Sequence, residues 1–264
     1  RTSCGLGEHP SWSLNMKVQI ASDLHGEFLA DGLATIASEI IPVAGDVLVL
    51  AGDIFGCHPR EQILREFTHF TSRWKNVVYV TGNHEYYGGT FEEVHDNLDW
   101  AKARLPNLHI LRNSKVEIEG KTFIGGTLWF PAKPDPERAR ELMNDFSYID
   151  EPMSRFHREN ATLREFLEKE VKEGDFVVTH HLPTEDCVSP FYKKSALNKF
   201  FVGDADAVLK NKPKYWAYGH THDPSVKVVD STTLICNPRG YYKSPRKSMT
   251  PGKDLFNPSL VVEF

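Results

Sequence analysis

Residues 76–85 read NVVYVTGNHE, a short valine-rich run that stops at a glycine followed by an amide, an imidazole and a carboxylate. An apolar run of this length and composition is typical of a central β-strand that is covered on both faces. Four other apolar runs in the chain also end in polar residues, and they span 18–21, 46–51, 175–179 and 215–218. The repeated pattern predicts an α/β fold built around short buried strands.

Each predicted strand is followed by residues that can carry chemistry. The clusters are Asp-Leu-His at 23–25, Gly-Asp at 52–53, Gly-Asn-His-Glu at 82–85, His-His at 180–181 and Gly-His-Thr-His at 219–222. In α/β sheets, ligands bind beyond the carboxyl ends of the strands. We therefore expect the five clusters to meet at one edge of the fold.

The remaining pattern predicts helices and late strands. Amphipathic stretches that favour helices span 59–74, 90–105, 152–172 and 195–209. Residues 116–125 are typical of a hairpin that turns at Glu119 and Gly120, and 226–236 and 259–264 are expected to be strands. We expect residues 16–264 to form a single domain. Residues 1–15, which precede the first methionine, are expected to be an expression-derived segment.

Composition excludes several classes of protein. The 264 residues are 40% hydrophobic and 25% charged, which argues against a disordered or coiled-coil chain. No apolar run approaches the ~20 residues that cross a bilayer, so no membrane span is expected. The net charge of -5 disfavours nucleic-acid binding through a broad basic face. Four scattered cysteines without metal-site spacing are typical of a cytoplasmic protein.

The strand-end residues have the composition of a metal site. Carboxylates, imidazoles and one amide, with no thiolate, suit Mn, Fe, Zn or Co. There are too many candidate ligands for one tetrahedral ion and enough for two. A carboxylate can bridge two ions and hold them ~3.5–4 Å apart, as in hydrolytic sites that act on phosphate. The sequence therefore predicts two divalent or trivalent transition-metal ions.

Five motifs together resemble the calcineurin-like metallophosphoesterase superfamily. They are SDLHGEF at 22–28, AGDI at 51–54, TGNHEYY at 81–87, VVTHHLP at 177–183 and YGHTH at 218–222. The stretches GGTLW, MNDFSYI and NPRGY are similar to a bacterial and phage phosphoesterase group within it. The resemblance implies a four-layer α/β/β/α sandwich, in which two mixed β-sheets are flanked by helices.

The resemblance also implies a role for each strand-end residue. Asp53 would bridge the two metals and, with His84, form the catalytic pair, because His84 matches the histidine that contacts the phosphoryl oxygen or helps to protonate the leaving group. His181 rivals His180 as a ligand, and we favour His180 because it directly ends its strand. The ligands of the first metal would be Asp23, His25 and His222, and those of the second Asn83, His180 and His220.

The expected activity is hydrolysis of a small phosphoester by direct attack of a metal-bound hydroxide. Phosphodiesters are the first expectation for the substrate and phosphomonoesters the second. A nuclease acting on DNA or RNA is an alternative, which the acidic charge disfavours. A non-catalytic interaction scaffold of the same fold is a further alternative, which the intact set of ligands opposes.

Other residues near the motifs have two interpretations each. Tyr86, Tyr87 and Trp129 either shape the substrate pocket or pack in the core. Glu85 either orients a neighbouring imidazole or faces solvent. The basic and aromatic stretch 191–201 is either a lid or nucleic-acid contact, or a helix with an apolar face.

Overall fold

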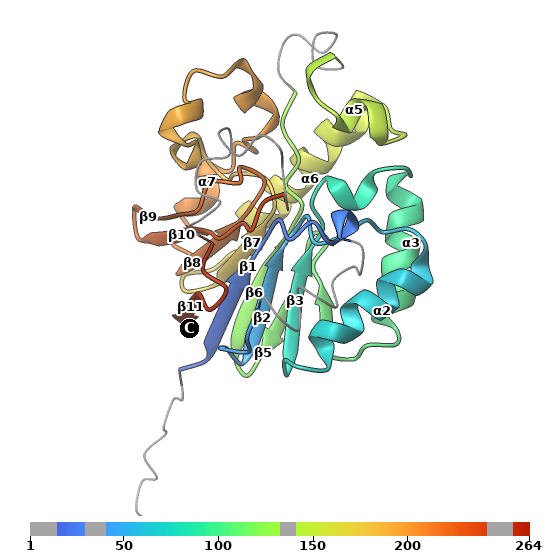
Figure 1. The fold of residues 1–264 in the computed structure, drawn as a ribbon. Coiled ribbons are helices and arrows are strands. Elements are labelled where there is room, and N and C mark those ends of the chain that lie inside the picture. Colours follow the sequence, from blue (N-terminus) through green and yellow to red (C-terminus); the bar gives the residue numbers. More distant parts are fainter. Residues whose placement is uncertain (1–14, 30–40, 133–140, 242–255) are drawn as a thin grey trace, which may run out of the picture.

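Two β-sheets form the centre of the molecule. The structure is a computed structural model that describes residues 15–29, 41–132, 141–241 and 256–264. The segment expected to be expression-derived lies, apart from its last residue, outside the described residues. The strands form one sheet of five and one of six (Figure 1).

The first sheet has the order β11-β1-β2-β3-β4. Strands β1 to β4 are parallel, and β11 pairs antiparallel with β1 at the edge. The strands span β1 Lys17–Ala21, β2 Val47–Ala51, β3 Asn76–Val80, β4 Leu108–Ile110 and β11 Val261–Glu263. The strands predicted at 18–21, 46–51 and 76–80 are therefore present as neighbours, and the strand predicted at 259–264 is present as β11.

The second sheet has the order β5-β6-β7-β8-β10-β9. Strands β6, β7, β8 and β10 are parallel, while β5 and β9 are antiparallel edge strands. Glu119 and Gly120 both have positive φ, 50° and 78°, as the two-residue turn of a hairpin requires. The strands span β5 Ser114–Ile118, β6 Lys121–Gly126, β7 Phe176–Thr179, β8 Tyr215–Tyr218, β9 Ser225–Val229 and β10 Thr232–Cys236.

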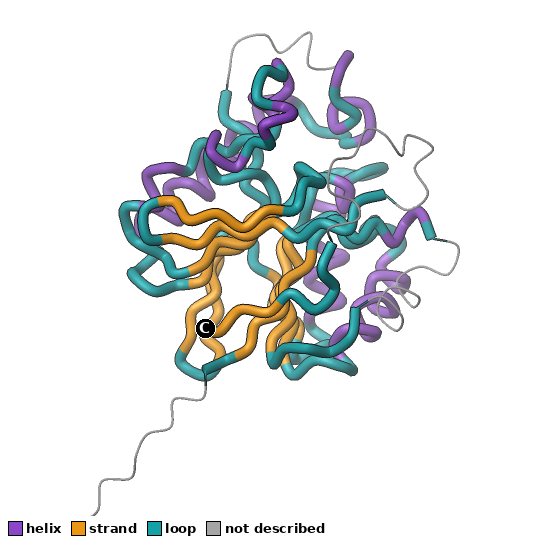
Figure 2. The backbone as a smooth tube through the Cα atoms, turned by 60° about the vertical axis from the view of Figure 1, so that its left-hand side comes forward, coloured by secondary structure: helices purple, strands orange, loops and turns teal. Residues whose placement is uncertain are grey.

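The strands are buried on both faces, which produces the layers. In β2, Val47 and Val49 pack between the sheets, while Leu48 and Leu50 pack against the helices. Helices α2 (Arg60–Thr71) and α3 (Phe91–Lys102) cover the first sheet, and α6 (Met153–Glu170) and α7 (Asp206–Leu209) cover the second. The order is helix, sheet, sheet, helix (Figure 2), so the four-layer α/β/β/α sandwich is confirmed.

Three of the four predicted long helices are present, and the fourth prediction is wrong. Residues 195–209 form the short 3-10 helix η6 (Ala196–Phe200) and the one-turn helix α7, not one amphipathic helix. The chain turns between them at Asp204, whose φ of 53° cannot continue a right-handed helix. The other short helices are η1 (Gly26–Phe28), η3 (His84–Tyr86), α5 (Asp145–Tyr148), η4 (Glu185–Cys187) and η5 (Pro190–Tyr192).

None of the helices in the described residues combines the length and the apolar character needed to cross a bilayer. The longest, α6, has 18 residues; its buried Leu163 and Leu167 pack in the core of the second sheet, and its buried Phe156 packs in the core of the first. Its charged residues occupy the rest of its surface, as expected for a helix at the outside of a layered fold.

Candidate metal centre

The carboxyl ends of five strands meet where the two sheets come together. Strands β1, β2 and β3 approach this edge from the first sheet, and β7 and β8 approach it from the second. The loops after these strands bring together all eight residues that the sequence singled out. These residues are Asp23, His25, Asp53, Asn83, His84, His180, His220 and His222.

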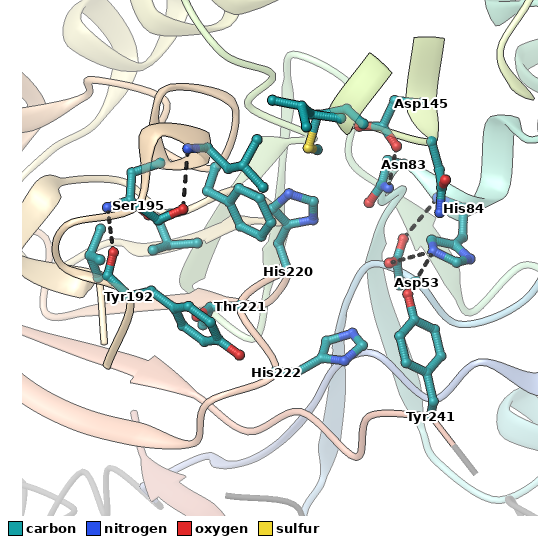
Figure 3. A pocket seen from close by; sticks show the side chains of 18 of the residues that line it. Asp53, Asn83, His84, Asp145, Tyr192, Ser195, His220, Thr221, His222 and Tyr241 are labelled. Carbon is teal, nitrogen blue, oxygen red and sulfur yellow. Dashed lines mark hydrogen bonds and ion pairs between the residues drawn. The ribbon is translucent and has the colours of Figure 1, made fainter. Parts of the chain in front are cut away.

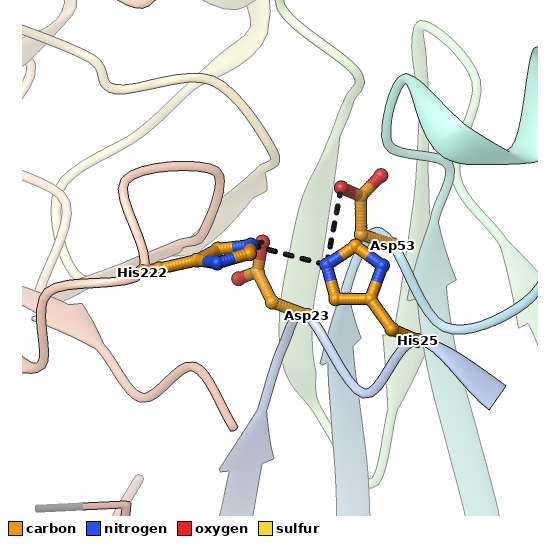
Figure 4. A group of neighbouring side chains, drawn as sticks. All are labelled: Asp23, His25, Asp53 and His222. Carbon is orange, nitrogen blue, oxygen red and sulfur yellow. Dashed lines mark hydrogen bonds and ion pairs between the residues drawn. The ribbon is translucent and has the colours of Figure 1, made fainter. Parts of the chain in front are cut away.

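Four side chains form the first group: Asp23, His25, Asp53 and His222, whose candidate ligand atoms lie within 4.8 Å of one another (Figure 4). His25 Nε2 lies 3.0 Å from His222 Nε2, and His222 Nε2 lies 3.2 Å from Asp23 Oδ1. His25 Nε2 also lies 3.8 Å from Asp53 Oδ2. Nitrogen and oxygen lone pairs therefore face a common point.

The second group contains Asp53 again, together with His180 and His220. His180 Nε2 lies 3.4 Å from Asp53 Oδ1, and it lies 3.1 Å from Asn83 Oδ1. His220 Nε2 is buried and has no hydrogen-bond partner among the described residues. The two carboxylate oxygens of Asp53 thus face different groups, which places Asp53 between them, where a bridging ligand would lie.

Neighbouring hydrogen bonds fix which nitrogen of two of these histidines faces the cluster. His180 Nδ1 lies 2.9 Å from the carbonyl oxygen of Ala51, which can only accept, so Nδ1 carries the proton and donates. His25 Nδ1 likewise lies 3.0 Å from Glu27 Oε1. In both rings Nε2 is then left to coordinate, as in metal sites whose histidines donate their other N–H to an oxygen.

His181 takes a different direction from its neighbour. Its ring packs against Trp129 and against His220, with centroids 5.0 and 4.3 Å apart. Its Nδ1 lies 3.3 Å from the carbonyl oxygen of Thr127, and its Nε2 is buried without a partner in the described part of the chain. Of the two adjacent histidines, His180 is the one grouped with Asp53.

Five of the seven proposed ligands have a left-handed backbone. The φ angles are 51° for Asp23, 50° for His25, 55° for Asp53, 69° for His220 and 51° for His222. Outside glycine this conformation costs roughly 1–2 kcal/mol per residue, and such strain is concentrated at functional sites. The sharp turn at each strand end directs the side chain back into the cluster instead of along the strand.

Gly52, Gly82 and Gly219 directly precede three candidate ligands, and none of these positions has room for a side chain. A Cβ at Gly82 would collide with the Asp53 carboxylate, and one at Gly219 would lie 2.6 Å from Asp23 Oδ2. The glycines in the Gly-Asn-His-Glu and Gly-His-Thr-His motifs therefore allow the loops of the two sheets to close onto the carboxylates.

The two buried aspartates are held as anions. Burial alone would raise the pKa of Asp53, but the adjacent His180 and His84 lower it well below its usual range. Burial likewise opposes ionisation of Asp23, and His222 beside it lowers its pKa. The Ser22 hydroxyl and the backbone N–H of His220 donate to Asp23, at 2.5 and 3.0 Å. Buried carboxylates surrounded by imidazoles fit a cationic ligand.

His84 lies beside the first group and is held by a residue that the sequence reasoning missed. Glu27 Oε1 accepts from His84 Nδ1 at 3.0 Å and from His25 Nδ1 at the same distance. Burial opposes protonation of His84, but the charge of Asp53 and the hydrogen bond to Glu27 raise its pKa to about 9. Glu27 stands in the SDLHGEF motif, so its place near the site was readable although its partners were not.

Tyr241 closes the first group from the side of the C-terminal segment. Its ring lies against His25 and His222, with centroids 4.4 and 4.7 Å apart. Its hydroxyl lies 3.2 Å from His84 Nε2, the nitrogen that is not engaged by Glu27. Tyr241 therefore lines the pocket beside the candidate metal ligands (Figure 3).

Asp145 orients the amide of Asn83, a role that the sequence did not indicate. Asn83 Nδ2 donates to Asp145 Oδ1 at 2.7 Å, so the amide oxygen turns toward His180. The Tyr87 hydroxyl donates to the same Asp145 oxygen at 2.7 Å. Asp145 stands in the MNDFSYI stretch, far from Asn83 in sequence, so no local pattern indicated this pair.

Both interpretations of Glu85 are wrong. Its carboxylate is fully buried and contacts no imidazole of the described residues; it accepts the backbone N–H groups of Asp53, Ile54 and Gly82 at 2.8–3.1 Å and the Tyr79 hydroxyl at 2.9 Å. Glu85 thus joins the loops after β2 and β3. It shapes the site by holding the backbone that carries Asp53.

Of the three aromatic residues that were expected either in the pocket or in the core, one lies in the pocket and two lie in the core. Tyr87 lines the pocket, whereas Tyr86 and Trp129 pack in the core of the first sheet. The stretch 191–201 contributes Tyr192, Leu197 and Phe201 to one pocket wall.

Comparisons with known proteins identify the family of this chain. Residues 16–224 match the model of the calcineurin-like phosphoesterase family. The chain is 24% identical over 277 residues to the uncharacterised protein L509 of Acanthamoeba polyphaga mimivirus, covering 93% of this chain and 96% of that one.

Solved structures share the fold at low sequence identity. The phosphopantetheinyl hydrolase PptH of Mycobacterium tuberculosis superposes with a TM-score of 0.70 at 19% identity, covering 89% of this chain and 94% of that one. The protein TT1561 of Thermus thermophilus superposes with a TM-score of 0.53 at 12% identity, over 85% and 89% of the two chains. With the family model matched over most of its length, the chain belongs to the calcineurin-like phosphoesterase family.

Proposed function

We propose that this protein is a dinuclear metal-dependent hydrolase of small phosphoesters, with phosphodiesters as the first substrate class and phosphomonoesters as the second. The family and the clusters of His and Asp support a metal-dependent phosphoesterase. The observation that carries the proposal is the placement of Asp53, whose two oxygens face two separate groups of candidate ligands.

The donor set fits two transition-metal ions. Asp23, His25 and His222 would hold one ion with Asp53, and Asn83, His180 and His220 would hold the other. His220 Nε2, which is buried and has no partner among the described residues, is a ring nitrogen whose lone pair a cation would satisfy. When bound, the two ions would polarise the phosphoryl group and supply a nucleophilic hydroxide near neutral pH. Mn, Fe, Zn and Co all suit these ligands.

The protein's own part in the reaction falls to His84 and its neighbours. Glu27 holds Nδ1 of His84, so Nε2 faces the pocket beside Tyr241. A protonated imidazole in this place donates to a phosphoryl oxygen or to the leaving oxygen. The Glu27 hydrogen bond favours the protonated ring, and the Tyr241 hydroxyl is placed to extend its donation into the pocket.

A small ester fits the site better than a nucleic acid. Among the described residues, neither Lys nor Arg lines the pocket that contains Asp53 and His84. Binding of a polynucleotide depends on cationic side chains along its backbone.

The cysteines bear on where the protein works, which we propose is the cytoplasm. The three described cysteines, Cys57, Cys187 and Cys236, are buried and unpaired, which accords with that location.

The test combines metal content with hydrolysis. The purified chain is analysed for Mn, Fe, Zn and Co, then assayed against phosphomonoesters, phosphodiesters, phosphotriesters, nucleotides and DNA with added Mn and with chelator. We expect about two metal ions per chain, hydrolysis of small esters, and loss of both metal and activity in Asn83→Ala. A hydrolysis rate that is unchanged by chelation refutes the metal mechanism. If the chain takes up no metal and the Asn83→Ala variant still binds the same partners, the protein is a non-catalytic scaffold.

A further inference from the structure

The pocket over the metal centre is larger than a phosphoryl group requires. It contains Asp53, His84, His220 and His222 and has a volume of about 640 Å³. Cavities of roughly 300–1,000 Å³ enclose organic ligands of drug size. Most of the residues that line it are not candidate metal ligands, so the pocket has room for an organic group beside a phosphoryl group.

One side of that space is apolar. Leu182, Val188, Leu197 and Phe201 line it from the stretch after β7, and Leu142 and Met143 line it from the segment before α5. We call these six residues the apolar wall. Figure 3 shows Tyr192 and Ser195, from the same stretch, across the pocket from His84 and Tyr241, with His220 between them.

The part of the wall after β7 is built into the fold. Leu182 N–H donates to the Phe201 carbonyl at 3.0 Å, and Gly203 N–H donates to the Leu182 carbonyl at 2.8 Å. The side chain of Asn160, buried in α6, donates to Gly203 O at 2.9 Å. The Phe201 ring lies against the proposed ligand His220, with centroids 4.3 Å apart.

The wall therefore has a fixed position relative to the site of chemistry. Leu182 follows His180 by two residues, and Phe201 contacts His220. A preformed apolar surface beside a polar centre binds a ligand that has both characters. Leu142, which is 52% exposed, lines the pocket although it would gain from being covered.

We propose that the substrate is an amphipathic phosphoester, whose phosphoryl group lies at the metal centre and whose apolar organic group, an alkyl chain or an aromatic ring, lies on the apolar wall. This inference rests on the proposed phosphoesterase function. The absence of Lys and Arg from the described lining disfavours a second phosphate or a charged chain in the same space. Each methylene group buried on the wall raises kcat/KM by up to about fourfold.

The experiment holds the leaving group constant and varies the apolar group. Alkyl p-nitrophenyl phosphates from methyl to octyl are assayed with the metal-loaded full chain, below the concentrations at which they form micelles. The matching alkyl phosphate monoesters, phenyl p-nitrophenyl phosphate and a dinucleotide are assayed in parallel. We expect kcat/KM to rise with the length of the alkyl chain until the chain no longer fits in the pocket. If the apolar wall binds an aromatic ring, kcat/KM is also expected to be higher for the phenyl ester than for the methyl ester.

Variants of the same stretch show whether the wall causes the slope. Leu197→Ala is expected to flatten the dependence of kcat/KM on chain length, so that the octyl and methyl esters differ less than they do with the parent chain. Phe191→Ala is the matched control, because Phe191 is 69% exposed and lies outside the lining. Metal content and the melting temperature check that both variants are folded.

The outcomes separate the inference from the function beneath it. Hydrolysis of every ester with no preference for longer chains or rings overturns the apolar-wall proposal and leaves the phosphoesterase intact. A dinucleotide cleaved faster than all alkyl and aryl esters also overturns it. Failure of the metal-loaded protein to hydrolyse any monoester or diester refutes the proposed function itself.

Discussion

Replacing Glu27 with Gln tests whether the carboxylate that joins His25 and His84 serves the reaction. Glu27 accepts from the Nδ1 atoms of both rings at 3.0 Å, and its pKa is lowered to about 2 because these hydrogen bonds and charges outweigh the cost of burial. Glutamine keeps the size of the side chain but removes the negative charge. The neutral amide oxygen of glutamine accepts weaker hydrogen bonds than a carboxylate oxygen, so both rings are held less strongly.

The expected size of the effect follows from the hydrogen bond that is weakened. A hydrogen bond to a charged group contributes about 1.5–3 kcal/mol, which corresponds to about 10- to 150-fold in rate when it is lost in the transition state. The loss is expected in kcat with an alcohol leaving group, which needs a proton from His84. It is expected to be several-fold smaller with p-nitrophenolate, which leaves without one.

The assay compares the two leaving groups in Glu27→Gln and in Glu61→Gln, an exposed control on α2. Metal content is measured for each variant, because Glu27 also orients the proposed ligand His25. If Glu27→Gln keeps both metal ions and hydrolyses the alcohol ester within twofold of the parent rate, then Glu27 does not act through His84. Equal losses for both leaving groups, with metal lost, would place its role in metal binding alone.

Three further outcomes are expected. Tyr241→Phe keeps the ring over His25 and is expected to retain metal while lowering kcat by about tenfold with poor leaving groups, as loss of one hydrogen bond implies; an unchanged kcat would limit Tyr241 to packing. The rate is expected to fall as pH rises through the pKa of His84, because only the protonated ring donates a proton. That pKa is raised to about 9 in the metal-free chain, and bound cations would lower it by offsetting the charge of Asp53. The pH–rate profile of His84→Asn should lack this fall. Tyr79→Phe is expected to lower the free energy of unfolding by about 1–2 kcal/mol, measured by urea denaturation, because the hydroxyl no longer donates to buried Glu85.

The elements and residues that follow from local sequence were predictable. A buried strand ending at Gly82 and Asn83 is visible in ten residues, and the same holds for the strand that ends at His180. Because parallel strands place their carboxyl ends at one edge, convergence of the clusters also followed from the pattern. The prediction of two metal ions rested on the types of the strand-end residues and on the resemblance of the motifs to a known superfamily.

The features that depend on tertiary contacts were not predictable. Glu27 lies two residues after His25, yet nothing local indicates that it also reaches His84, 57 residues away. Asp145 meets Asn83 across 62 residues, and its stretch shows no periodicity that would mark it. The helix expected over 195–209 failed because its apolar residues do not form one stripe: Leu197 and Phe201 line the pocket, whereas Val202, Val208 and Leu209 pack in the core of the second sheet.

The position of Asp53 explains why the site depends on both sheets. β2 lies between β1 and β3 in the first sheet and also packs against β7 and β8 of the second. A carboxylate that turns back at the end of this central strand can therefore face His25 on one side and His180 on the other. Three local features accompany this position: Asp53 has a left-handed backbone, which costs free energy, Gly82 has no room for a side chain, and the buried carboxylate of Glu85 holds the backbone N–H of Asp53. They are accounted for together if the carboxylate must hold one fixed orientation between two groups of ligands, which a loop on a single sheet could not supply.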